Sequence, residues 1–88
     1  MAIECKAFTW TKGNKEPSAK ITIAREVILY MQWLPKDWTQ ILAMSRSTRT
    51  THAESLAEYF VRLNRHLLGG VIVVEVDDNR ARVLHGAL

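Results

Sequence analysis

The polar segment between Ser45 and Ser55, SRSTRTTHAES, carries the residues of this chain whose types and spacing best suit ligand binding. It contains two arginines and several hydroxyl side chains, and its largest apolar residue is alanine. Guanidinium and hydroxyl groups donate hydrogen bonds to phosphate oxygens, and the free N–H groups of a helix start favour an anion. We therefore expect a docking point for a polyanion, with a solvated loop that ends in a helix cap as the alternative. The expected phosphate contacts are Arg46, Ser47, Arg49, Thr50 and Thr51.

Residues that could support catalysis or bind a metal do not occur at telling spacings. The histidines His52, His66 and His85 lie far apart, and His66 falls where a helix end favours a cation. Cys5 lies in an expected strand, where a small buried hydrophobe is favoured over a reactive thiol. We therefore expect no enzymatic activity, no metal site and no cofactor.

The bulk properties indicate one domain in a reducing compartment. The chain has 88 residues, a formal charge of +3 and a single cysteine, so it cannot form an internal disulfide. Its longest apolar run is far shorter than the roughly 20 residues that span a bilayer. We expect a cytoplasmic protein without a membrane partner. The mildly basic charge permits a nucleic-acid partner without demanding one.

The first half of the chain predicts a strand, a loop and a helix. Residues 3–10 mix β-branched and aromatic side chains and predict a strand, and TKGNKEPS predicts a loop. A helical stripe predicts a helix over 23–34, ended by Pro35. A strand over 20–32 stays open, and it would give a four-stranded sheet on two helices. The stripe consists of Ile23, Val27, Tyr30, Met31 and Leu34.

Two further helices are expected before the C-terminal strands. Asp37 and Gln40 resemble a capping box and predict a short helix over 38–44. Thr51 and Glu54 form a second S/T-x-x-E capping box, which predicts a long helix that Gly69-Gly70 ends. On this helix we expect an ion pair between Glu58 and Arg62. Its predicted apolar face consists of Leu56, Tyr59, Phe60, Leu63 and Leu67.

The segment VIVVEVDDNRARVLH predicts a β-hairpin. Asp78-Asn79 suits a two-residue turn, because both residue types tolerate left-handed backbone. In that register Glu75 faces Arg82, and Asp77 faces Arg80. The other face of the hairpin is then apolar and consists of Ile72, Val74, Val76, Ala81 and Val83.

Three aromatic residues gather around Pro35 and have two interpretations. Tyr30, Trp33 and Trp38 could pack as a core corner between two helices, which we favour. They could instead form an aromatic anchor for a partner protein, because Trp and Tyr dominate interface hot spots.

Residues 38–84, WTQILAMSRSTRTTHAESLAEYFVRLNRHLLGGVIVVEVDDNRARVL, resemble the winged helix-turn-helix proteins of bacteria and phages. ILAMSRST is similar to the first motif helix and turn of that family, and VRLNRHLLGGVIVVE to the recognition-helix end and first wing strand. The resemblance implies an α+β, winged-helix-like domain with an N-terminal strand, three helices and a C-terminal hairpin. It implies that His52 and Ser55 reach base edges, that the phosphate contacts named above lie on the DNA backbone, and that Lys36 assists them. For Arg80 and Arg82, neutralisation of the acids opposite them in the hairpin is the alternative. The implied DNA-binding set is Lys36, Arg46, Ser47, Arg49, Thr50, Thr51, His52, Ser55, Arg62, Arg80 and Arg82.

The sequence therefore favours a small DNA-binding transcriptional regulator, which could act as a homodimer on double-stranded DNA. The alternative is a protein-binding adaptor or inhibitor of the kind that mobile elements encode, with Tyr30, Trp33 and Trp38 as its contact residues. The short length, the missing catalytic groups and the acidic hairpin tip motivate this alternative.

Overall fold

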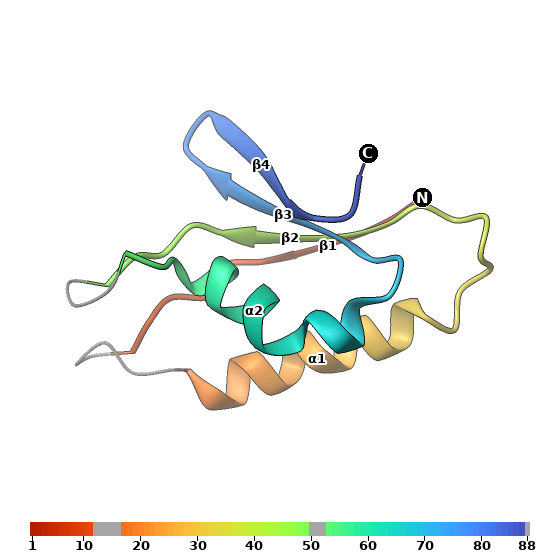
Figure 1. Ribbon diagram of the computed structural model, residues 1–88, viewed down its shortest axis with the longest axis horizontal. Coiled ribbons are helices and arrows are strands. Elements are labelled where there is room, and N and C mark those ends of the chain that lie inside the picture. The colour runs from red at the N-terminus through yellow and green to blue at the C-terminus, as the bar shows by residue number, and fades with distance from the viewer. Residues whose placement is uncertain (12–16, 50–52, 88) are drawn as a thin grey trace.

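The computed structural model describes residues 1–11, 17–49 and 53–87. Its strands form one sheet in the order β1-β2-β3-β4, in which β1, β2 and β3 are parallel and β4 is antiparallel to β3. Both helices lie on the same side of this sheet, so the protein has two layers (Figure 1). The elements are β1 (Ala2–Lys6), α1 (Ser18–Met31), β2 (Gln40–Ser45), α2 (Leu56–Leu68), β3 (Ile72–Asp77) and β4 (Arg80–His85).

The central strand β2 overturns the winged-helix-like prediction, although the α+β class agrees with the structure. The helix expected over 38–44 is wrong, because this segment lies between β1 and β3 as a strand. A strand between two parallel neighbours needs apolar side chains on both faces. Leu42 and Met44 meet this need on the helix side and Ile41 on the other side, and all three are buried. The described residues form two helices instead of the predicted three. The segment expected as the first helix of a helix-turn-helix is the strand β2.

The helix predicted over 23–34 is confirmed by α1, and the alternative strand over 20–32 is wrong. The helix α1 begins at Ser18 and ends at Met31, so both ends lie earlier than the predicted 23 and 34. The predicted stripe is also rotated, because Ile23 and Tyr30 are exposed. The strand expected over 3–10 ends at Lys6, and the chain beyond it sends two aromatic side chains into the core. The residues of α1 that are buried are Ile21, Ala24, Ile28 and Met31.

The N-cap of α2 lies four residues after the predicted N-cap, Thr51. The observed N-cap is Ser55, which forms a capping box with Glu58, while Thr51 of the predicted box lies outside the described residues. Gly69 ends the helix with a φ of 53°, as predicted for a glycine stop. The expected ion pair between Glu58 and Arg62 is wrong, because Arg62 binds Glu54 at 2.8 Å. The predicted apolar face is right for Leu56 and Phe60, which are buried, and wrong for Leu63, which is exposed.

The C-terminal hairpin confirms its prediction, including the register. Glu75 pairs with Arg82 and Asp77 with Arg80 across β3 and β4. Asp78 has a φ of 36°, in the left-handed region that the turn requires. The expected apolar face of the hairpin follows from the same register.

The two faces of the sheet differ in what covers them. The helices cover one face and bury the main core, which includes Leu42, Met44, Phe60 and Val73. The other face, called the open face below, has no layer of described residues over it (Figure 1). The strand registers place only uncharged residues on the open face: Ile3, Cys5, Ile41, Ala43, Ser45, Ile72, Val74, Val76, Ala81 and Val83.

Candidate functional site

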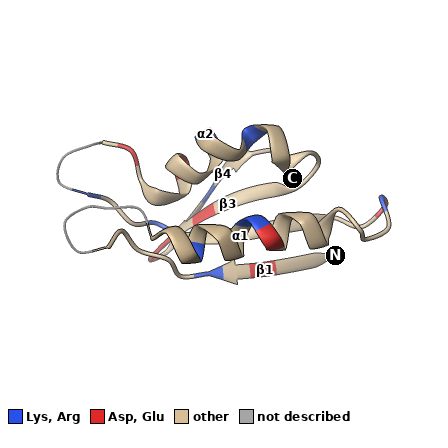
Figure 2. Ribbon diagram, turned by 90° about the horizontal axis from the view of Figure 1, so that it is seen from below, with Lys and Arg blue, Asp and Glu red and all other residues tan. Residues whose placement is uncertain are grey.

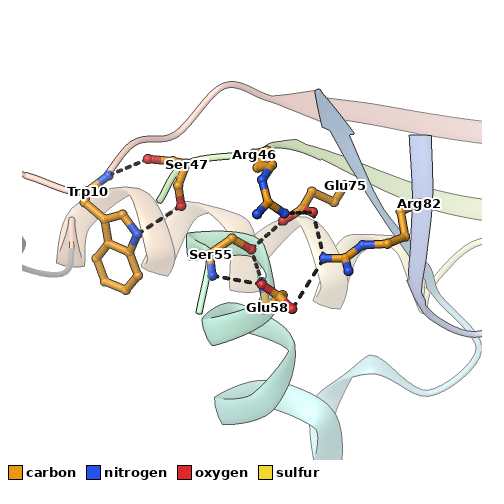
Figure 3. Close-up of polar contacts among 7 residues, drawn as sticks. All are labelled: Trp10, Arg46, Ser47, Ser55, Glu58, Glu75 and Arg82. Carbon is orange, nitrogen blue, oxygen red and sulfur yellow. Dashed lines mark hydrogen bonds and ion pairs between the residues drawn. The ribbon is translucent and has the colours of Figure 1, made fainter. Parts of the chain in front are cut away.

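A buried carboxylate organises the end of the sheet where β2 and β3 finish. Glu75 lies on the helix-facing side of β3 and is 3% exposed. Arg46 donates to it at 3.0 Å, Arg82 donates at 2.9 Å, and the Ser55 hydroxyl donates a further hydrogen bond (Figure 3). A buried charge is costly unless it is paired and hydrogen-bonded, and Glu75 is both.

The capping box of α2 joins this network. The Glu58 N–H donates to the Ser55 hydroxyl at 3.2 Å, and the Ser55 N–H donates to the Glu58 carboxylate at 2.9 Å. The Ser55 N–H is the main reason why the pKa of Glu58 lies below its usual value. Arg82 lies 3.3 Å from Glu58, while its hydrogen bond to Glu75 raises its own pKa. The network therefore fastens the start of α2 to the hairpin.

The loop after β2 is held by an aromatic side chain. The Trp10 backbone N–H donates to the Ser47 hydroxyl at 3.2 Å, and its indole N–H donates to the Ser47 carbonyl at 3.0 Å. The Arg49 guanidinium lies 3.8 Å from the centre of the Trp10 ring. The centre of the Tyr59 ring, on α2, lies 5.1 Å from the centre of the Trp10 ring. The segment predicted to dock a polyanion is thus engaged by Glu75 through Arg46 and by Trp10 through Ser47 and Arg49.

The structure brings three of the predicted DNA-binding residues into one hollow. Arg46, Arg80 and Arg82 line a hollow of about 390 Å³, together with the acids Glu75 and Asp77. The two carboxylates offset part of the positive charge, so the local potential is weaker than three arginines alone would give.

The other predicted DNA-binding residues lie elsewhere. Lys36 precedes β2 and therefore lies at the opposite end of this strand from Arg46, and Arg62 binds Glu54. Ser55 caps α2 instead of facing outward, because it is buried. Lys and Arg positions lie apart on both helices and on loops at both ends of the sheet (Figure 2). Thr50, Thr51 and His52 lie outside the described residues.

The aromatic residues near Pro35 do not form a core corner, so that interpretation is wrong. The exposed fraction is 75% for Tyr30 and 89% for Trp33. The two side chains border an apolar hollow of about 540 Å³ between the edge strand β1 and the C-terminal half of α1. We call this hollow the β1–α1 groove. It is lined by Ala2, Ile3, Glu4, Val27, Tyr30, Met31, Trp33 and Leu34.

A second hollow on α1 adjoins the β1–α1 groove. It measures about 270 Å³, and its lining residues are Glu26, Leu29, Tyr30 and Trp33. Tyr30 and Trp33 therefore line both hollows. Trp38 lies apart from them and lines another hollow with Lys36 and Gln40. The predicted aromatic trio is thus divided into a pair and a single residue.

Three smaller predictions concern possible reactive groups. Cys5 is exposed on the edge strand β1, so its expected burial is wrong. His66 lies in the last turn of α2, as predicted. Within residues 1–11, 17–49 and 53–87, no three His, Cys, Asp or Glu side chains gather as a metal site would require.

Among these same residues, neither helix has the length and apolar character of a transmembrane span.

Sequence reasoning found part of this site and missed the rest. The alternation of the hairpin indicated the Glu75–Arg82 pair, but Ser55 and Arg46 join Glu75 only because β2 lies beside β3. The partner-binding interpretation named Tyr30 and Trp33, but the wall that β1 provides had no signal in the sequence.

Comparison of the chain with protein-family models, curated proteins and solved structures finds no match.

Proposed function

We propose that this protein is a non-catalytic recognition module that binds a segment of another protein in the β1–α1 groove. The observation that carries the proposal is the exposure of Trp33, at 89%, beside an apolar hollow. Exposed large aromatic side chains on a concave apolar surface are typical of interaction sites. Tyr30 and Leu29, exposed by 75% and 50%, extend the same surface along α1.

The chemistry of the groove favours a protein ligand over a small polar one. Among the described residues that line the groove, Glu4 is the one that carries a charge, Tyr30 carries a hydroxyl, and the other six are apolar or aromatic. The polar network around Glu75, in contrast, directs its donors and acceptors toward one another. Covering the groove would therefore remove apolar surface from water, which favours binding.

Binding of double-stranded DNA is the second candidate function. The hollow lined by Arg46, Arg80 and Arg82 favours it, because guanidinium groups bind phosphate through two parallel N–H donors. In this fold the contacts would come from the hairpin and the loop after β2. Glu75 and Asp77 in the same hollow work against a phosphate, which is why we rank this function second.

Display of random twelve-residue peptides, selected on the immobilised protein, tests the first proposal. We expect enriched peptides whose binding is lost in Trp33→Ala, because truncating an aromatic hot spot costs about 2 kcal/mol or more. Trp38→Ala is the matched control, since this exposed tryptophan lines a different hollow.

Thermal unfolding of both variants checks that the loss is local to the groove. Absence of enrichment over an unrelated protein would contradict the proposal, and so would peptides that bind Trp33→Ala as tightly as the parent. A random DNA duplex is titrated in parallel. Salt-sensitive binding of the duplex with no peptide enrichment would favour the second candidate instead.

A further inference from the structure

We infer that the ligand of the β1–α1 groove is an extended segment that pairs with β1 as a fifth strand. It places one apolar side chain in the groove, with Lys or Arg on either side of it. The inference rests on the proposed function and adds the conformation and charge of the ligand.

The free edge of β1 supplies the backbone groups for such pairing. The Ala2 N–H donates to the Thr39 carbonyl at 2.8 Å, so Ala2 directs its backbone toward β2. Alternate residues of a strand direct their backbone groups to opposite sides, and Ile3 and Cys5 therefore direct theirs away from β2. Within the described part of the chain, β2 is the one strand that pairs with β1. An added strand can bond to both Ile3 and Cys5.

The opposite edge of the sheet lacks this opportunity. The edge strand β4 pairs irregularly with β3 between Val73 and Val74, whereas β1 pairs with β2 without a register shift. Irregular pairing is a feature that protects edge strands from further pairing. The contrast makes β1 the edge that accepts a partner.

The groove lies where the side chains of an added strand would reach. Neighbouring strands are about 4.8 Å apart, and alternate side chains of the new strand would point to the helix side. These side chains would enter the space between Glu4 on β1 and the exposed rings of Tyr30 and Trp33. An apolar side chain fits that space, because Val27, Met31 and Leu34 are among its lining residues.

The charges around the groove select the residues beside the apolar side chain. Glu4 lines the groove and Glu26 lines the adjoining hollow, and both are exposed. Lys6 lies 4.0 Å from Glu4, at the limit of an ion pair, and neutralises it only weakly. Lys or Arg of the ligand can also lie over the rings of Tyr30 and Trp33. The groove therefore favours a basic ligand over an acidic one.

The peptide acetyl-Thr-Lys-Thr-Leu-Thr-Lys-Thr-amide is the probe, because its alternation sends Lys, Leu and Lys to one side. Titration followed by NMR should shift the amide signals of Ile3 and Cys5 and the indole signal of Trp33. Replacing both lysines of the probe by glutamate should weaken binding by about tenfold. N-methylation of the backbone groups that face β1 should abolish binding, since it removes the donors of the added strand.

Glu4→Gln together with Glu26→Gln should remove the preference for the lysine probe, and Asp37→Asn serves as the control carboxylate outside the groove. Equal binding of the N-methylated probe would contradict strand addition. Equal binding of the glutamate probe would contradict the charge preference. If displayed peptides bind through Trp33 but this probe does not, the inference is wrong while the proposed function stands.

Discussion

Glu58 is the residue that carries both a structural and an electrostatic role at the start of α2. Its carboxylate accepts the Ser55 N–H and lies 3.3 Å from Arg82. These contacts lower its pKa, with the hydrogen bond from Ser55 as the largest cause. Because the folded pKa is lower than the unfolded one, the carboxylate stabilises the fold above its unfolded pKa. This stabilisation is lost as the pH falls through the folded pKa.

Glu58→Gln should therefore be less stable than the parent at pH 7, by about 0.3–1 kcal/mol. The amide keeps an acceptor for the capping box but loses the charge, so the difference in unfolding free energy should shrink below about pH 4. Urea unfolding between pH 7 and pH 3 measures it. Glu26→Gln is the control, because this exposed glutamate lies in the middle of α1. A difference that stays constant with pH would contradict the role of the charge.

At the scale of elements, the start of α2 depends on one buried hydroxyl. Ser55 accepts the Glu58 N–H and donates to Glu75, so it serves the helix and the sheet together. Ser55→Ala should lower the free energy of unfolding by about 1–2 kcal/mol, because it removes a helix cap and one donor to a buried carboxylate.

Ser18→Ala is the matched control. Ser18 is the first residue of α1, and no side-chain hydrogen bond caps the start of this helix. We expect the effect of Ser18→Ala to stay within about 0.5 kcal/mol. Denaturant unfolding of both variants gives the comparison. Equal effects of the two substitutions would show that the hydroxyl of Ser55 has no special role.

The elements also show what the sequence can and cannot reveal. The hairpin was predictable because its partners Glu75 and Arg82 are close in the chain and alternate with apolar residues. The strand β2 was not, because its short apolar run fits a helix or a buried strand, and only the distant β1 and β3 decide between them. The same non-local pairing creates the β1–α1 groove. Tyr30 and Trp33 could thus be named as contacts but not placed.

At the scale of the whole molecule, β1 is attached to the core less firmly than β2 and β3 are. None of its residues belongs to the buried core of the described chain, whereas β2 and β3 contribute Leu42, Met44 and Val73. Local opening is easiest where few buried contacts hold an element.

Amide hydrogen exchange should therefore be at least about tenfold faster at Ala2 and Glu4, which face β2, than at Leu42 or Val73. Exchange followed by NMR at neutral pH gives the rates residue by residue. Uniform protection across the sheet would contradict this view. Slower exchange in β1 upon addition of a groove ligand would connect the attachment of β1 to binding.

The open face has a consequence for how the molecule responds to its surroundings. Its residues carry no charge, so any contact made there depends on the release of water and strengthens on warming, with little response to ionic strength. Glu4 and Glu26 border the groove and the adjoining hollow, so the contacts of a basic ligand with these carboxylates weaken as salt screens them. Binding at the open face should therefore respond mainly to temperature, whereas the charged contacts at the groove should respond mainly to salt concentration.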